Sequence, residues 1–234
     1  MFVPIYDHNK LDHVPLQFVT IGLIVVNVLI FVVFQSGLIG GQGEAIAFTY
    51  GMIPAVVMDI RDLPPEYAVF SDTWEPITLI TYQFLHGGWM HLIGNMAFLW
   101  VFGDNIEDAL GHFKFLIFYL LCGVAAGLCQ ILIEPGSQAP VIGASGAVAG
   151  IIGAYLMLHP KVKVWVLVMM RIPIRLSAMW VLGFWIGFQI FMAFAFPDEA
   201  VAWWAHIGGF IAGALLVIPL KRRGVLLFDR GMRT

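Results

Sequence analysis

Long apolar runs separated by short polar segments dominate this chain. Six runs contain no Asp, Glu, Lys or Arg, and most approach the roughly 20 residues that a helix needs to cross about 30 Å of hydrocarbon. These runs cover residues 16–34, 84–102, 115–133, 145–159, 176–196 and 202–220. The fourth is the shortest, and its neighbours must shield it because lipid cannot satisfy exposed backbone groups. The pattern predicts an all-α membrane protein, a six-helix transmembrane bundle, and makes the beginning of the fourth helix a candidate functional site.

Composition and charge agree with a place in a bilayer. Hydrophobic residues make up 60% of the 234 positions and charged residues only 12%, and the net charge of −3 does not suit a nucleic-acid-binding protein. If six helices alternate in direction, every basic residue except Arg61 lies on the side of both termini, which the positive-inside rule makes cytoplasmic. These basic residues are Lys10, Lys114, Lys161, Lys163, Arg171, Arg175, Lys221, Arg222, Arg223, Arg230 and Arg233. The acidic residues expected on the outer side are Glu44, Asp59, Asp62, Glu66, Asp72, Glu75, Glu134, Asp198 and Glu199.

The runs divide the chain into three parts. Residues 1–15 are expected to form a polar cytoplasmic segment, residues 16–220 a six-helix domain, and residues 221–234 a basic cytoplasmic tail. The first run is longer than a signal-peptide core and is expected to stay as an uncleaved anchor. Residues 35–76 combine glycine and proline with many apolar residues, so this long outer loop between the first two helices is expected to lie in the membrane interface.

Polar residues inside the runs are the candidates for chemistry, because intramembrane polar groups are costly and usually functional. His91 and Asn95 lie four residues apart in the second run and so share one helical face. Ser145 opens the fourth run and His206 lies in the sixth. Counted back from the next basic residue at about 1.5 Å per residue, Ser145 and His206 both lie about 22–24 Å above the inner boundary. We therefore expect the two side chains at one depth, below the outer face.

Glycines suggest how these two helices approach each other. His206, Gly209 and Gly213 fall at i, i+3 and i+7, a stripe of small residues on which another helix can pack closely. Ordinary membrane bundles use the same contacts, and a lone histidine in a membrane helix is often structural. The agreement of serine and histidine in depth is the stronger signal.

These residue types suit nucleophilic catalysis. A serine nucleophile needs a base that takes its proton and donors that hold the negative oxygen of the tetrahedral intermediate. Ser145 starts a helix, where first-turn amides lack intrahelical partners and the helix dipole favours an anion. Its own N–H, His91 and Asn95 are candidate oxyanion donors, and His206 is the candidate base. Because no acidic residue is available at that depth, the pattern predicts a Ser–His dyad.

Three motifs in combination resemble the signature of the rhomboid intramembrane serine proteases. They are His86 with His91 and Asn95, the sequence Gly143-Ala144-Ser145-Gly146, and Ala205-His206 followed by Gly209 and Gly213, and the likeness covers residues 74–220. The resemblance implies an endopeptidase that cuts transmembrane segments of other membrane proteins near the outer face through an acyl-enzyme, with Ser145 as nucleophile and His206 as general base. It implies membrane-anchored substrates, no metal, no cofactor, and a bacterial or archaeal cell membrane onto whose outer side the active site opens.

The resemblance also implies supporting roles. The oxyanion hole would use His91, Asn95 and Ser145, structural support would come from His86, Glu107, Gly209 and Gly213, and the fifth helix would be a substrate gate with Trp185 and Phe188. Two features depart from the pattern. Ala149 stands where some bacterial members carry a tyrosine that stacks on the histidine, and the outer loop lacks a Trp-Arg pair found in part of the family.

Other classes fit less well. A rhomboid-like protein that binds membrane clients without cutting them is the alternative. A channel or transporter would need intramembrane charges or paired half-repeats, and neither an H-E-x-x-H zinc motif nor intramembrane aspartates occur. The other histidines, His8, His13, His112 and His159, are expected to have no partner. Cys122 and Cys129 lie about 10 Å apart along one helix and are expected to be packing residues.

Overall fold

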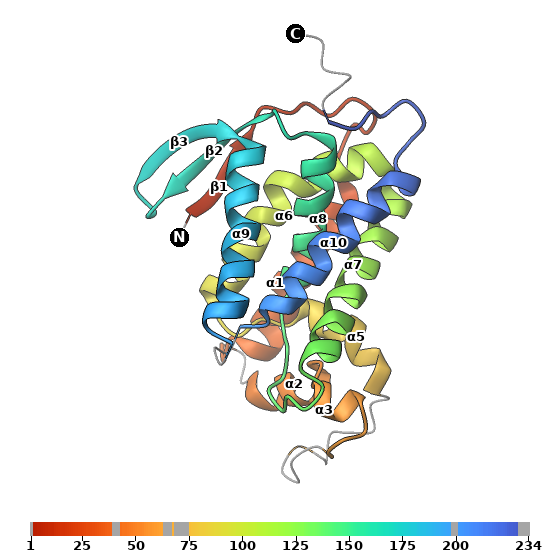
Figure 1. Ribbon diagram of the computed structural model, residues 1–234, viewed down its shortest axis with the longest axis vertical. Helices are drawn as coiled ribbons and strands as arrows, with labels where there is room; N and C mark the ends of the chain where they lie inside the picture. The colour runs from red at the N-terminus through yellow and green to blue at the C-terminus, as the bar shows by residue number, and fades with distance from the viewer. Residues whose placement is uncertain (1, 39–42, 63–66, 68–74, 198–200, 229–234) are drawn as a thin grey trace.

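The computed structural model describes residues 2–38, 43–62, 67, 75–197 and 201–228, and six longer helices form the body of this part of the chain (Figure 1). They are α1 (Phe18–Ile30), α6 (Trp89–Leu110), α7 (His112–Ile133), α8 (Ser145–Leu158), α9 (Ala178–Ala195) and α10 (Trp203–Leu220). Four helical segments are long and apolar enough to cross a membrane: α1 with its π-helical extension η1 (Phe31–Gln35), α7, α9 and α10. The shorter α8 is apolar as well.

The second helix lies further along the chain than its apolar run predicts. The run 84–102 begins in a 3₁₀ turn, η3 (Tyr82–Phe84), and α6 starts only after Gly87 and Gly88. Glycine loses the most backbone freedom in a helix, which explains the late start. At its other end α6 continues to Leu110 through Asp104, Glu107 and Asp108, and the carboxylates of Glu107 and Asp108 find partners in the segment that leads into α1.

The short helix α8 lies inside the bundle, packed against α10, α7 and α6. Its residues from Gly146 to Tyr155 are all buried. Small residues make this possible, since backbones approach closely only where side chains are absent or short. The neighbours thus shield the short helix.

Glycines bring α8 and α10 into backbone contact. A Cβ atom added at Gly209 would lie 2.0 Å from the carbonyl oxygen of Gly146, and one at Gly213 would lie 1.9 Å from that of Gly150. No side chain fits in either gap. The glycines therefore determine how α10, and with it His206, sits against the beginning of α8.

A small antiparallel sheet corrects the all-α prediction. Its strands are β1 (Phe2–Asp7), β2 (Lys163–Val168) and β3 (Ile172–Ser177), in the order β1-β2-β3. Phe2 pairs with Val168, and Lys163 pairs with Ser177. The sequence missed β1 because its partner strand lies some 160 residues away, and it missed the hairpin of β2 and β3 because its strands are short and merge with the apolar run that follows. Residues 1–15 thus include a sheet strand.

Carboxylates at the end of α6 tie down the amino-terminal part of the chain. Glu107 is fully buried, and its oxygens accept hydrogen bonds from the backbone N–H of Val19 at 2.9 Å, and from the N–H and hydroxyl of Thr20 at 2.8 and 2.7 Å. These N–H groups belong to the first turn of α1, which has no intrahelical acceptors for them. His112 Nδ1 lies 2.5 Å from the same carboxylate. The side chain of Glu107 therefore caps α1 from the last turn of α6.

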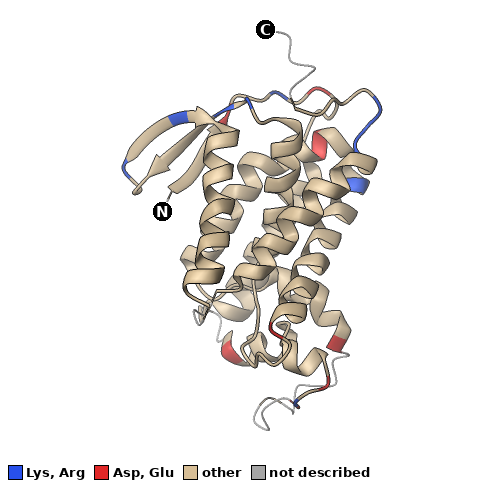
Figure 2. Cartoon of the chain, viewed as in Figure 1, with Lys and Arg blue, Asp and Glu red and all other residues tan. Residues whose placement is uncertain are grey.

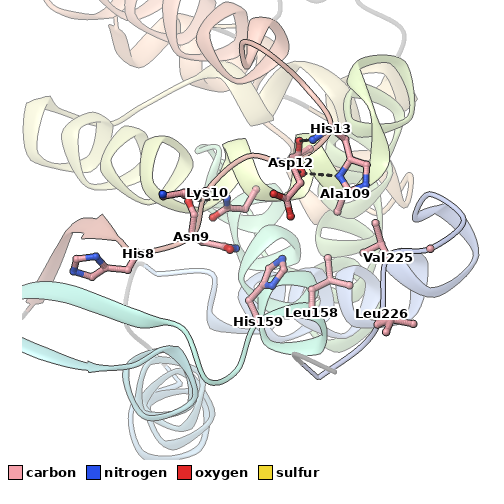
Figure 3. Close-up of a pocket in the computed structure, with 13 residues that line it drawn as sticks. His8, Asn9, Lys10, Asp12, His13, Ala109, Leu158, His159, Val225 and Leu226 are labelled. Carbon is pink, nitrogen blue, oxygen red and sulfur yellow. Dashed lines mark hydrogen bonds and ion pairs between the residues drawn. The ribbon is translucent and has the colours of Figure 1, made fainter. Parts of the chain in front are cut away.

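Asp108 binds the segment that precedes α1. It accepts the N–H groups of Asp12, His13 and Val14, and His13 Nδ1 lies 3.0 Å from its Oδ2. The amino-terminal segment, the ends of α6 and α8, and residues 224–226 line a cavity of about 590 Å³. Figure 3 shows the residues around it. The expectation that His8, His13, His112 and His159 have no partner is therefore wrong. The carboxylate partners of His13 and His112 lie in the last turn of α6, and the rings of His8 and His159 pack edge to face on those of Tyr6 and Tyr155.

The predicted outer loop, between α1 and α6, carries short helices, α2 (Gly43–Tyr50) and α3 (Pro54–Val57), followed by η2 (Glu75–Ile77) and α5 (Thr78–Thr81). A β-bridge between Met52 and Val141, and the hydrogen bond from the N–H of Ala55 to the carbonyl of Ser137, join it to the segment before α8. Figure 2 shows most of the lysines and arginines at one end of the bundle and acidic residues at both ends. Of the residues named above for their charge, Glu66, Asp72, Asp198, Glu199, Arg230 and Arg233 lie outside the described residues.

Candidate active site

Ser145 and His206 meet where α8 and α10 begin. Ser145 is the first residue of α8, and His206 lies in the first turn of α10. The Nε2 atom of His206 lies 2.9 Å from the Oγ atom of Ser145, within hydrogen-bond reach. Gln130 of α7 holds the adjacent backbone, because its Oε1 accepts the N–H of Ala205 at 3.2 Å. The serine hydroxyl can thus donate to the imidazole.

The turn before Ser145 requires glycine. Gly143 has a φ of 131°, which side chains of L residues rarely allow. A Cβ atom there would lie 2.7 Å from Nε2 of His91 and 3.4 Å from Oγ of Ser145. The N–H of Gly143 donates to the carbonyl of Tyr82 at 2.9 Å. The ring of His91 and the serine hydroxyl therefore border the same small space, which the missing side chain leaves open.

A cavity of about 370 Å³ joins the predicted residues, with Ser145, His206, His91 and Asn95 all in its lining. Asn95 is 8% exposed, and its Nδ2 has no hydrogen-bond partner among the residues that the structure describes. Leaving a buried donor unpaired costs about 1–3 kcal/mol. Because Asn95 also lines the cavity, its unpaired amide is a candidate donor to an oxygen atom bound there.

The other nitrogen of His206 has a partner that the sequence did not predict. Nδ1 lies 2.8 Å from Oε1 of Gln189, a buried side chain of α9. The predicted dyad allows only an acidic residue as a third group, whereas the amide oxygen of a glutamine also accepts a hydrogen bond. The sequence feature that could have indicated this partner is Gln189 itself, a glutamine in the middle of the apolar run 176–196.

Aromatic rings also surround His206. The ring of Trp185 lies 5.8 Å from it between centroids, and that of Trp203 lies 6.1 Å away, nearly perpendicular. Ala149, at the position of the tyrosine found in some bacterial rhomboids, is fully buried. In this chain the rings against the histidine come from α9 and α10, not from α8.

His86 lies next to His91 at the start of α6. It is buried, its N–H donates to Oε1 of Gln35 at 2.9 Å, and the two histidine rings pack edge to face with centroids 5.1 Å apart. These contacts suit structural support. No cluster of three or more His, Cys, Asp or Glu that could hold a metal ion occurs within the described part of the chain.

The two predicted gate residues lie on α9 and differ in how far their side chains are buried. Trp185 is half-buried, between His206 and Phe98 of α6, whose ring centroid is 6.2 Å away. Phe188 is 44% exposed and meets Trp203 edge to face. The structure thus places Trp185 at the cavity, and Phe188 at the seam between α9 and α10.

Fold and site together define a helical integral membrane protein with a candidate serine–histidine pair. The family model of the Rhomboid domain matches residues 73–223, more than half of the chain. The chain therefore belongs to the rhomboid family, a family of intramembrane proteases.

Similar proteins from a plant, a yeast and a bacterium support the assignment to this family. The chain is 31% identical over 155 residues to RHOMBOID-like protein 5 of Arabidopsis thaliana, a match that covers 65% of this chain and 46% of the relative. It is 30% identical over 148 residues to Rhomboid protein 1, mitochondrial, of Saccharomyces cerevisiae, covering 59% and 40%. It is 31% identical over 149 residues to Rhomboid protease GluP of Bacillus subtilis, covering 64% and 27%. The chain spans less than half of the length of each of these relatives.

Proposed function

We propose that this chain is a serine endopeptidase that cleaves transmembrane segments of other membrane proteins near the outer membrane face. The observation that carries the proposal is the 2.9 Å contact between Ser145 Oγ and His206 Nε2, beside a cavity that holds the unpaired amide of Asn95. Family membership and the relative named as a protease add to it.

The chemistry would run through a covalent intermediate. His206 takes the proton of Ser145 as Oγ attacks the scissile carbonyl, and the negative oxygen of the tetrahedral intermediate accepts hydrogen bonds from the N–H of Ser145, the amide of Asn95 and the ring of His91. The proton then passes from His206 to the leaving amine. A water molecule, deprotonated by the same histidine, hydrolyses the acyl-enzyme and restores the serine.

The same proposal includes a membrane topology. We place α1, α6, α7, α8, α9 and α10 as six transmembrane helices, with residues 16–220 as the catalytic domain and residues 1–15 and 221–234 in the cytoplasm of a bacterial or archaeal cell. The end of the bundle with most of the basic residues faces the cytoplasm. The active site then opens towards the outer side, and the outer loop lies in the interface.

Substrates would enter past α9, which packs mainly on α10. A cysteine pair, Phe98→Cys with Trp185→Cys, bridged by a reducible bis-methanethiosulfonate reagent, would join α9 to α6 where the two aromatic rings lie 6.2 Å apart between centroids. The cross-linked enzyme should stop cleaving a single-span substrate but still react with a fluorophosphonate, because only the large substrate needs the helices to part. The reduced double variant is the matched control, and cleavage at its rate by the cross-linked form would refute gating.

The decisive experiment for the activity is covalent labelling. The purified protein in detergent should react with a fluorophosphonate probe at Ser145, and Ser145→Ala and His206→Ala should abolish cleavage of a single-span substrate while keeping the parent's thermal unfolding temperature within a few degrees. Labelling at another residue would refute the nucleophile. Binding of membrane proteins by a folded parent that neither labels nor cleaves would favour the non-proteolytic alternative.

A further inference from the structure

Gln189 is the residue in the site that the dyad chemistry leaves without a role. It lies on α9, is 4% exposed, and lines the same cavity as Ser145 and His206. Its Oε1 lies 2.8 Å from Nδ1 of His206, and its Nε2 donates to the backbone carbonyl of Trp185 at 3.2 Å. Both ends of the amide are therefore engaged.

The second contact determines which way the amide faces. The carbonyl of Trp185 can only accept a hydrogen bond, so the NH₂ group of Gln189 must point to it and the oxygen must point to His206. An amide oxygen in turn can only accept, so Nδ1 of His206 must carry a proton. In the neutral ring this leaves Nε2 without a proton and able to accept one from Ser145.

The contacts thus form a directed chain from Ser145 Oγ through His206 to Gln189 and on to the backbone of α9. In serine hydrolases with a catalytic triad, the third residue orients the histidine and holds it in this tautomer. Here a neutral amide can do the orienting, although it cannot balance the charge of the imidazolium as a carboxylate would.

We propose that Gln189 is a positioning residue that holds His206 in the tautomer and orientation needed to deprotonate Ser145. The inference rests on the proposed serine-protease function. It gives α9 a second role besides admitting substrate, because the helical turn that contains Gln189 must pack against α10 while the peptide bond of the substrate is cleaved. Opening of α9 and cleavage would then alternate rather than coincide.

Three variants test this proposal. Gln189→Met removes the acceptor at similar volume, Gln189→Glu keeps an acceptor in the same place, and Phe191→Met changes an exposed side chain of the same helix as the control. For a single-span substrate, we expect Gln189→Met to lower kcat by about 10–100-fold, a part of the 10²–10⁴ that general-base catalysis supplies, with KM little changed. Gln189→Glu should recover most of the lost kcat, and Phe191→Met should match the parent.

Nitrogen NMR of the labelled histidine ring supplies a readout that a purely structural role would not move. In the parent, His206 should carry its proton on Nδ1, and in Gln189→Met it should become a mixture of tautomers. A parent ring protonated on Nε2, or a Gln189→Met enzyme with the parent's kcat, would overturn the proposal. If the parent fails to react with a fluorophosphonate, the protease function fails instead, and the NMR measurement still decides whether Gln189 sets the tautomer.

Discussion

Substituting Gly209 by alanine tests whether backbone contact between α8 and α10 positions the histidine. The new Cβ would lie 2.0 Å from the carbonyl oxygen of Gly146 and 3.0 Å from its carbonyl carbon. Ordinary van der Waals contact begins at 3.4 Å, so the two backbones must separate by about 1.4 Å along this contact. His206 is only one turn from Gly209 on α10, and its hydrogen bond to Ser145 is 2.9 Å long. The same shift would take the imidazole out of reach of the hydroxyl.

The size of the effect follows from this displacement. A misplacement of about 1 Å at a reacting group can cost about 10²-fold in rate, and overpacking a tight contact typically costs about 1–3 kcal/mol of stability. We therefore expect Gly209→Ala to lower the rate of cleavage of a single-span substrate by at least about 10²-fold, and to lower the thermal unfolding temperature measurably.

The matched control is Gly187→Ala on α9, where an added Cβ meets no atom within 4 Å. Alanine is the better helix former by about 1 kcal/mol, so this variant should be as active and at least as stable as the parent. Both variants are assayed for initial cleavage rates in proteoliposomes and for thermal unfolding in detergent. Parental rate and stability in Gly209→Ala would refute the claim that glycine contact sets the position of His206.

Three further substitutions probe the oxyanion hole, the cap of α1 and the sheet. Asn95→Ala should lower kcat by about 10–10³-fold in the same assay, since it removes one of several proposed oxyanion donors, and a loss of thermal stability in parallel would show a structural role instead. Glu107→Ala should lower the free energy of unfolding by about 1–3 kcal/mol for each buried N–H left without an acceptor, measured by denaturant titration against the exposed control Glu44→Ala. Burial raises the pKa of Asp7 from 3.8 to about 6, although Tyr155 donates to its carboxylate. The folded protein therefore binds a proton that the unfolded chain has released between these values, and stability falls as pH rises through that window. Asp7→Asn should remove this part of the pH dependence, at most about 3 kcal/mol, in thermal melts between about pH 4 and pH 7.

The sequence could predict the parts of the site that depend only on how deep a residue lies along its own membrane helix. A bilayer has a known thickness and a helix a known rise, so counting residues placed Ser145 and His206 at one depth, and the structure brings their side chains together. The four-residue spacing of His91 and Asn95 worked in the same way, and both line the cavity. The rise per residue and the thickness of the bilayer were sufficient there, because together they fix the depth of each residue within its own helix.

Contacts between segments that are distant in sequence could not be predicted in this way, because no known length relates their positions. β1 pairs with β2 across some 160 residues, and no periodicity within either strand shows that partner. Gln189 belongs to the same class, since its role depends on the rotation of α9 against α10. A polar residue in an apolar run showed only that some partner must exist.

The environment of α10 also indicates where the bundle can open. On one side its glycines touch the backbone of α8 directly, and separating them would break close packing over two turns. On the other side, among the residues that the structure describes, α9 meets it through bulky rings and the hydrogen bond between His206 and Gln189. Large side chains hold membrane helices together less closely than small ones, so the seam between α9 and α10 should part first. The bond to Gln189 is then the first contact that opening breaks, and the histidine loses its orientation whenever the site is open to lipid. Such an enzyme would keep its serine inactive until a substrate has entered and α9 has returned.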